Sequence, residues 1–210
     1  MAASIRGVIE LVTAILLGLV SVTTALGAYQ ASVWALEADD YRQVAVQMRD
    51  RNLTELLTAQ LIFKQDGAKL TRAFTLESEA VLYPERADDI AQEQQALLSS
   101  ASPGFYEQWV LWRDADFAEE LTPLLQPEYE TQLFSQPHSL QYSSFVANQL
   151  ADAAGVKSAQ VAVASVVFAI ALLLLGVAGV NASWKVAATL AGSAALAYIG
   201  GLLFLLITVF

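Results

Sequence analysis

The chain contains no cysteine and only one histidine among its 210 residues. Without cysteine it forms no disulfides, no thiolate metal site and no cysteine nucleophile. A histidine-rich zinc site is excluded, and any Ser-His-Asp arrangement would have to use His138. This histidine follows Pro137 in a stretch that we expect to be a loop, where an exposed and inert imidazole is the ordinary outcome. We therefore predict no metal, no cofactor and no histidine-based catalysis.

Charged residues are also scarce, at 15% of the chain, against about 25% in an ordinary soluble domain. They are unevenly placed, because 20 of the 21 acidic and nine of the 11 basic residues lie in the region 37–157. That region has a formal balance of −11. Such a balance argues against nucleic acid as a partner, since phosphate binding rests on lysine and arginine. A basic protein surface or cations would suit it better.

Three long runs carry no charged residue, at 11–36, 158–184 and 186–210. A bilayer core about 30 Å thick is crossed by roughly 20 apolar residues of helix. Within hydrocarbon every backbone amide has to be paired inside its own segment, so each run is expected to be helical. The sequence predicts an integral membrane protein with three transmembrane helices and the lipid bilayer as a partner.

The first run has an alternative interpretation as a cleaved signal peptide, with small residues at 25–27 as the cleavage site. Its apolar stretch is long for a signal peptide, and only Arg6 precedes it as a basic side chain. We therefore favour a retained span.

A short turn at 181–185 joins the second and third spans, which predicts a helical hairpin. With three spans, the polar region and the C-terminus share one side of the membrane. The lysine and arginine bias that sets orientation is weak here. Because long loops translocate largely regardless of charge, we expect the polar region outside the cytoplasm. Three aromatic residues fit an interfacial belt at the span ends, namely Tyr29, Trp34 and Trp184.

Small residues at four-residue spacing occur in two of the spans. The first span has the pairs Ala14/Gly18 and Ser21/Ala25, and the third has the rows Ala187/Ala191/Ala195 and Ser193/Ala197/Gly201. Such rows let helix backbones approach closely in a membrane. We favour packing between helices of one chain over self-association.

The polar region shows helical periodicity and no alternating strand pattern. The stretch 36–65 has neither glycine nor proline, so the first span is expected to continue as one long helix that Gly67 bends and Tyr83-Pro84 ends. Further helices are expected at 85–98, at 105–121 and from 140 into the second span, with Pro123, Pro127 and Pro137 breaking the chain between them. The predicted fold is all-α, with a transmembrane helix at 1–35, an acidic helical domain at 36–157 and a transmembrane hairpin at 158–210.

Aromatic residues are concentrated in the second half of the polar region, nine of them within the 41 residues 105–145. Such side chains fill the core of a small domain, or they line a groove for a peptide, a glycan or a lipid tail. We favour the core, and we expect that Trp109 and Trp112 do not both face inward on one helix. The candidate interaction residues here are Tyr106, Trp109 and Trp112.

Acidic residues cluster directly after these aromatics, at Asp114, Asp116, Glu119 and Glu120. Glycosidases and calcium sites both use grouped carboxylates. The segment lacks the glycine and the alternating oxygen ligands of a calcium loop, however, so a solvated helix face is the favoured interpretation. Asp114 and Asp116 complete the candidate interaction residues. No charged residue lies well inside a span, which counts against a pump or secondary transporter.

Several short stretches resemble a broad group of bacterial integral membrane proteins of uncharacterised activity. These stretches are 13–18, the segment Ala-Tyr-Gln-Ala-Ser-Val-Trp at 28–34, the segment Phe-Tyr-Glu-Gln-Trp at 105–109, and the terminal hairpin. The group has one N-terminal span, a helical insert and a C-terminal hairpin of two spans. The resemblance implies the bacterial inner membrane and carries no activity or site residue. The resemblance also implies that the polar region lies outside the cytoplasm, although the hairpin turn is more basic in that group.

The absence of a catalytic constellation and of charge within the spans favours a non-enzymatic membrane protein. We expect it to present its acidic helical domain as an accessory, scaffold or interaction subunit, bound to another protein or to further copies of itself. One alternative is a sensory or ligand-binding module that signals through a separate partner. Another is an enzyme that acts on lipid or envelope material through its clustered carboxylates.

Overall fold

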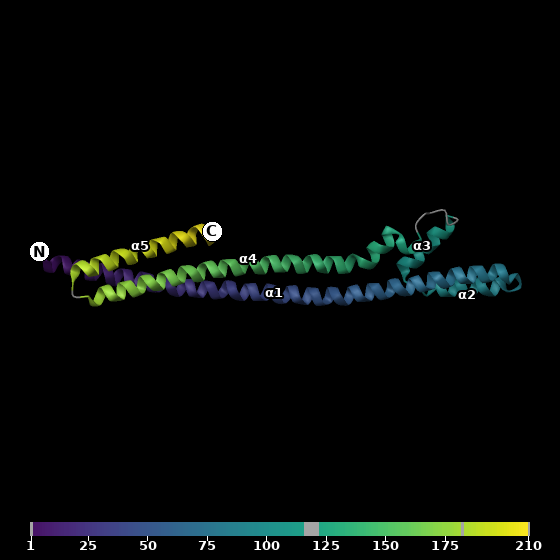
Figure 1. Cartoon of the computed structure of the whole chain (residues 1–210), viewed down its shortest axis with the longest axis horizontal. Coiled ribbons are helices and arrows are strands. Elements are labelled where there is room, and N and C mark those ends of the chain that lie inside the picture. The colour runs from purple at the N-terminus through teal and green to yellow at the C-terminus, as the bar shows by residue number, and fades with distance from the viewer. Residues whose placement is uncertain (1, 116–121, 182, 210) are drawn as a thin grey trace. The chain divides into compact units, whose positions relative to one another are not determined.

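The computed structural model describes residues 2–115, 122–181 and 183–209, and nearly all of them are helical. Its α-helices are α1 (Ala2–Leu82), α2 (Ala87–Ser99), α3 (Pro103–Asp114), α4 (Pro127–Val180) and α5 (Trp184–Val209) (Figure 1). Two short 3-10 helices, η1 (Pro84–Arg86) and η2 (Pro123–Leu125), precede α2 and α4. No strand occurs among the described residues, which confirms the all-α prediction.

Three of these helices contain an apolar stretch long enough to cross a membrane. They are α1, α4 and α5, which contain most of the three uncharged runs of the sequence. Their length and composition are those of an integral membrane protein. The turn between α4 and α5 follows Val180 and ends before Trp184, so it is shorter than the predicted turn of 181–185.

Helix α1 runs without a break from Ala2 to Leu82, as the lack of proline in this stretch leads one to expect. Gly67 does not interrupt it. The helix ends because Pro84 disfavours helical geometry at the residue before it. Tyr83 accordingly has φ −128° and ψ 72°.

Helix α4 differs from the prediction at its start. It begins at Pro127, where the missing N–H of proline is no loss in the first turn, and it continues through Pro137. The prediction that Pro137 breaks the chain and that the helix begins at 140 is therefore wrong. A proline inside a helix removes one backbone hydrogen bond and bends the axis. Figure 1 shows a change of direction in this first part of α4.

The chain divides into two compact units, which are described separately. Unit 1 comprises Met1–Val44 and Val146–Phe210, and unit 2 comprises Ala45–Phe145. Helices α1 and α4 each contribute to both units.

The core of unit 1 follows a seven-residue repeat on α4. Ala147, Ala154, Val161, Phe168 and Leu175 are spaced seven residues apart and are all buried. A heptad repeat of buried positions keeps one helix face against a neighbouring helix along its length. The repeat explains how α4 holds α1 beside it in this unit, where Figure 1 shows both helices and α5 folded back from the turn.

Two glycines let the helices of unit 1 approach closely. A Cβ atom on Gly27 of α1 would lie 2.6 Å from Ser165 Oγ on α4, and one on Gly201 of α5 would lie 2.6 Å from the Phe168 ring. The Ser158 hydroxyl adds a hydrogen bond of 2.8 Å to the Ala31 carbonyl and fixes the register of α4 on α1. Small residues thus set the helix spacing in this unit.

The predicted rows of small residues behave differently on the two helices. On α5, Ala187 and Ala191 are buried, as packing within the chain requires. On α1, the row of Ala14, Gly18, Ser21 and Ala25 is exposed. On α5 the expectation that such rows serve packing within one chain is confirmed for Ala187, Ala191 and Gly201 but not for Ser193, which is exposed. It is wrong for the two pairs on α1.

Unit 2 also contains a seven-residue repeat, on α1. Ala45, Ala59, Asp66 and Ala73 lie on it and are all buried. The Ser144 hydroxyl of α4 donates a hydrogen bond of 3.0 Å to the Ala45 carbonyl, so α4 packs against this face. Beyond Asp66, aromatic side chains from α3 and α4 replace alanine as the main filling of the core.

Candidate functional site

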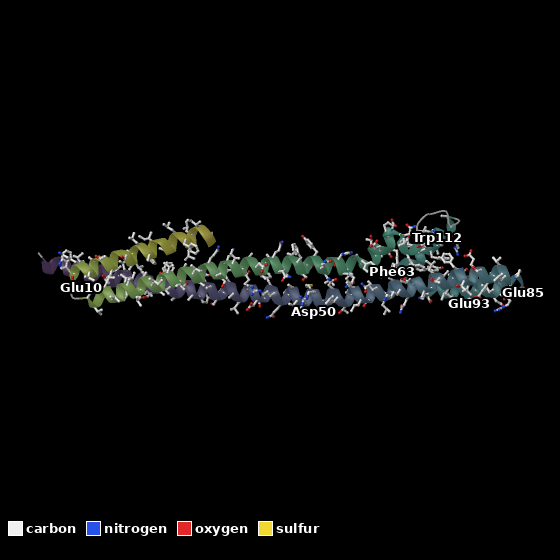
Figure 2. All side chains as sticks on the ribbon, viewed as in Figure 1. Glu10, Asp50, Phe63, Glu85, Glu93 and Trp112 are labelled. Carbon is white, nitrogen blue, oxygen red and sulfur yellow. The ribbon has the colours of Figure 1, made fainter. Side chains whose placement is uncertain are left out.

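The predicted aromatic residues form the core of unit 2. Phe105 is fully buried, Tyr129 is 1% exposed, and their rings meet edge to face with centroids 5.9 Å apart. Phe63 of α1 stacks on Tyr129 at 6.2 Å, and Phe74 of α1 reaches both tryptophans of α3 at about 6 Å. Figure 2 labels Phe63 and Trp112, two members of this cluster.

Both tryptophans face inward, so the expectation that only one of them does is wrong. Trp109 is 3% exposed and Trp112 is 8% exposed, with ring centroids 5.7 Å apart. Residues three apart on a helix differ by only about 60° in direction and therefore share a face. As candidate interaction residues, the two tryptophans lie in the core and not on the surface.

Of the other candidate interaction residues, two lie at the surface. Tyr106 is 37% exposed, and the Asp114 carboxylate is exposed beside Arg113 at 3.2 Å. Asp116 lies outside the described residues, as do Glu119 and Glu120. Helix α3 ends at Asp114, so the predicted helix of 105–121 is shorter within the described range.

A cavity of about 250 Å³ lies beside the aromatic cluster in unit 2. Its lining combines residues of α2 and α3, namely Ala91, Gln94, Gln95, Leu98, Tyr106, Trp109 and Arg113. This lining combines two aromatic rings with an arginine and two side-chain amides. The cavity uses Tyr106 and Trp109 from the predicted set.

The most unusual polar group of unit 2 is Asp66, which sequence reasoning did not single out. This carboxylate on α1 is 1% exposed. It accepts hydrogen bonds from the Ser102 backbone N–H at 3.1 Å, the Ser102 hydroxyl at 2.5 Å and the Tyr129 hydroxyl at 2.9 Å. Three donors satisfy a charge that would otherwise be costly to bury.

Asp66 connects three elements through these bonds. Ser102 caps the N-terminus of α3, where its hydroxyl also accepts from the Phe105 N–H at 3.4 Å. Burial, and next the hydrogen bond to Asp66, raise the pKa of Tyr129 above its usual value. The Tyr129 hydroxyl therefore stays protonated and acts as a donor. These contacts position helices and give no group that is free to react.

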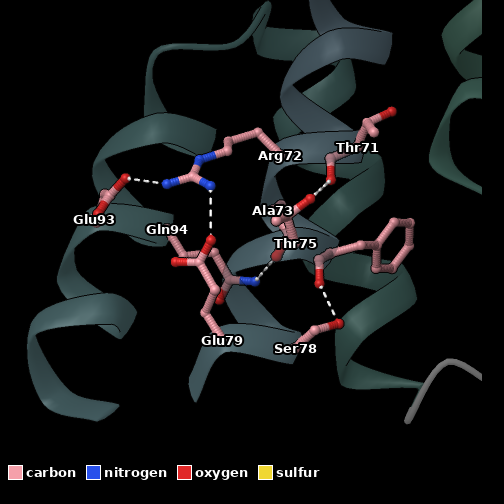
Figure 3. Close-up of polar contacts among 9 residues, drawn as sticks. Thr71, Arg72, Ala73, Thr75, Ser78, Glu79, Glu93 and Gln94 are labelled. Carbon is pink, nitrogen blue, oxygen red and sulfur yellow. Dashed lines mark hydrogen bonds and ion pairs between the residues drawn. The ribbon is translucent and has the colours of Figure 1, made fainter. Parts of the chain in front are cut away.

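An exposed ion-pair group joins α1 to α2 in the same unit (Figure 3). Arg72 contacts Glu79 at 3.0 Å and Glu93 at 3.1 Å, and the pair raises the pKa of Arg72, Glu93 most strongly. The Gln94 side chain donates to the Ala73 carbonyl at 3.1 Å. These ion pairs orient α2 on α1. Because they are exposed to solvent, they add little to the free energy of unfolding.

The described residues hold no group of three histidine, cysteine, aspartate or glutamate side chains that could bind a metal ion. His138 is exposed on α4. Other carboxylates, such as Asp50 and Glu85, are exposed on their helices (Figure 2).

The three predicted interface aromatics lie in unit 1. Tyr29 is 64% exposed on α1 and Trp184 is 49% exposed at the start of α5. The Lys185 ammonium lies 5.9 Å from the Trp184 ring centroid, and the Lys157 ammonium lies 4.5 Å from that of Trp34. Aromatic rings with a lysine beside them are typical of the boundary between hydrocarbon and water.

A groove of about 730 Å³ runs down from Lys157 and Trp34 between the three helices of unit 1. Its lining is Thr23, Leu26, Gly27, Gln30, Trp34, Lys157, Val161, Phe168, Leu202 and Leu205. Its walls are almost entirely apolar, and its single charged residue is Lys157. Only Trp34 of this lining belongs to the predicted set.

The described geometry thus includes the groove of unit 1 beside Trp34 and Lys157, the small mixed cavity of unit 2, and a polar network that positions helices. The chain matches no family model, no curated protein and no solved structure in the comparisons made.

Proposed function

We propose that the chain is a non-enzymatic membrane protein that presents its acidic helical domain to a protein partner. The observation that carries the proposal is an apolar stripe on α1 in unit 2. Leu53, Leu57 and Leu61 lie on successive turns and are 52%, 66% and 56% exposed. We call these three residues the leucine stripe.

The leucine stripe is a second apolar face on a helix that already packs through another one. Ala45 and Ala59 belong to the buried repeat of the same helix. A helix with two apolar faces uses one for its own fold and has the other available for a partner. Residues at i, i+4 and i+8 match the anchors of helix-to-helix recognition. The expected occupant is therefore a helix.

Charge favours a different protein over a second copy. The sequence of unit 2 carries 16 acidic and seven basic residues. Two such surfaces repel each other, whereas a helix with basic flanks is attracted. The partner proposed is an amphipathic helix with lysine or arginine beside its apolar face.

The proposal includes a location in the bacterial inner membrane, with unit 2 outside the cytoplasm. Its support is the set of three apolar helices, the weak charge bias and the rule for long loops. A reporter fused after Phe210 tests the orientation, because that end of the chain is expected on the same side as unit 2. Activity of a periplasm-dependent reporter supports the proposed side, and activity of a cytoplasm-dependent one contradicts it.

The partner is tested by placing a photo-reactive amino acid at position 57 of the full chain in native membranes. A discrete cross-linked product that contains one other protein, identified by mass spectrometry, is the expected result. The matched control has the same amino acid at position 81, because Val81 lies on the same helix and is 77% exposed. A Leu57→Glu substitution should abolish co-purification of that protein, and Val81→Glu should not.

Two outcomes contradict the proposal as stated. A product composed of two copies of this chain would show a homo-oligomer, and no product at position 57 beyond that at position 81 would show that the stripe has no partner.

A ligand-sensing role is the second candidate, and the cavity beside Trp109 favours it. Arg113 and Gln95 give this cavity donors for a small anionic molecule. A panel of small carboxylates and phosphates that raises the unfolding temperature of the wild-type chain, but not of Arg113→Gln, would support sensing. No shift in either protein would remove this candidate.

A further inference from the structure

The groove of unit 1 has the shape and chemistry of a lipid site. We propose that it binds one anionic phospholipid, with an acyl chain between the helices and the phosphate at Lys157. The inference rests on unit 1 alone and does not depend on the partner proposed for unit 2.

The length of the groove matches one leaflet of a bilayer. Lys157 and Phe168 both line it and are 11 residues apart on α4. At 1.5 Å per residue this is about 16 Å, close to half of a hydrocarbon core about 30 Å thick. The volume of about 730 Å³ is within the usual range of small-molecule sites, about 300–1,000 Å³.

The walls suit an acyl chain. Leu26 and Thr23 of α1, Val161 of α4 and Leu202 of α5 enclose the groove from three sides. The Thr23 hydroxyl bonds to carbonyls of its own helix at 3.0 Å, so it presents its methyl group and leaves no donor unsatisfied. An apolar occupant therefore meets an apolar surface.

The end of the groove at Lys157 suits an anionic headgroup. Within the described part of the chain, no carboxylate lies at ion-pair distance from the Lys157 ammonium, whose contact is the Trp34 ring at 4.5 Å. A lysine at the membrane boundary without a protein counter-ion attracts a phosphate. A neutral occupant would leave this charge uncompensated.

The Gln30 amide adds a second polar group one turn from Trp34, facing the groove. Its side chain forms no hydrogen bond to any described residue, although it lies within an uncharged run expected in the membrane. An amide in hydrocarbon needs a partner. The ester carbonyl of a phospholipid lies deeper than its phosphate and can accept a hydrogen bond from the Gln30 amide.

The test is native mass spectrometry of the full chain, extracted from nanodiscs that contain equal amounts of phosphatidylglycerol and phosphatidylcholine. The wild-type chain should retain one lipid, with phosphatidylglycerol preferred by about fivefold, the preference given by one lysine near an anionic lipid. Leu26→Trp fills the groove and should lose the bound lipid. Val22→Trp is the matched control, because Val22 and Leu26 are 59% and 58% exposed on the same helix and Val22 does not line the groove.

The headgroup contact is tested separately by Lys157→Gln, which leaves the walls intact. This variant should still retain one lipid, but it should bind phosphatidylglycerol and phosphatidylcholine about equally. Helix content by circular dichroism confirms that each variant is folded.

Three results would overturn the proposal. They are equal retention of lipid by Leu26→Trp and Val22→Trp, an unchanged anionic preference in Lys157→Gln, and a wild-type dimer without lipid, in which a second chain fills the groove. Should Leu26→Trp fail to fold, Leu202→Trp closes the same groove from α5 and decides the question.

Discussion

The two units of this chain are helical bundles with opposite ways of filling their cores. In unit 1, five of the eight buried residues in the main cluster are alanine. In unit 2, four of the seven are aromatic. Small residues allow close helix contact where lipid removes the hydrophobic drive for association, and large rings bury apolar surface where water supplies that drive. The composition of each core therefore indicates the solvent around it.

The largest effect is expected when a large ring is removed from the core of unit 2. Phe105→Ala deletes a fully buried ring and should lower the free energy of unfolding by about 4 kcal/mol, because it leaves a cavity in the aromatic cluster. The measurement is near-ultraviolet circular dichroism of the full chain in detergent, where Trp109 and Trp112 report on unit 2. Tyr106→Ala is the control, because the Tyr106 ring is 37% exposed. Its removal should lower the free energy of unfolding far less. Equal effects would mean that Phe105 is not central to the core.

The second largest effect is expected at the buried carboxylate. Asp66→Ala leaves the Tyr129 hydroxyl and the Ser102 N–H without an acceptor. Unsatisfied buried groups of this kind should cost about 3 kcal/mol in unfolding free energy. Asp50→Ala, at an exposed position of the same helix, should stay within about 0.5 kcal/mol of the wild type. A small effect at Asp66 would show that the three hydrogen bonds do not hold α1, α3 and α4 together.

Much of the fold was predictable because its signals are local. Runs without charge predict the apolar helices, and the lack of glycine and proline after the first run predicts the long α1. Tyr83-Pro84 predicts its end through a steric clash between adjacent residues. The prediction at Pro137 was wrong. Proline is unfavourable inside a helix, but Pro137 itself is buried in unit 2, and this burial offsets the local cost.

The sites were less predictable because they depend on residues far apart in the sequence. Asp66 resembles any solvated aspartate until the seven-residue spacing from Ala45 and Ala59 to Ala73 is noticed. That repeat was the available signal, and it predicts that Asp66 faces the core. The groove had no such signal, since its walls come from three helices. The sequence places Trp34, Lys157 and Gln30 near one end of the spans, but it does not show that they line one groove.

In unit 1, the close packing of the helices predicts that a larger side chain at a helix contact lowers the free energy of unfolding. Gly201→Ala places a Cβ atom 2.6 Å from the buried Phe168 ring, which has to shift. The expected cost is about 2 kcal/mol in a titration with sodium dodecyl sulfate followed by far-ultraviolet circular dichroism. Gly192→Ala on the same helix meets nothing within 4 Å and should be neutral or stabilising by up to about 1 kcal/mol. Equal costs at the two glycines would argue against close packing of α4 and α5.

The smallest effect concerns unit 2 at alkaline pH. Burial, with the hydrogen bond to Asp66, raises the pKa of Tyr129 above its unfolded value of about 10. Above that pH the unfolded chain releases the tyrosine proton and the folded chain retains it, so the stability that is complete below pH 10 is lost as the pH rises. The unfolding free energy should fall by about 1 kcal/mol between pH 10 and pH 11. Tyr129→Phe removes the titrating hydroxyl, and its unfolding free energy should lack this component of the alkaline slope. An unchanged slope in Tyr129→Phe would assign the alkaline loss to other groups and leave the aromatic core of unit 2 without a pH-dependent hydrogen bond.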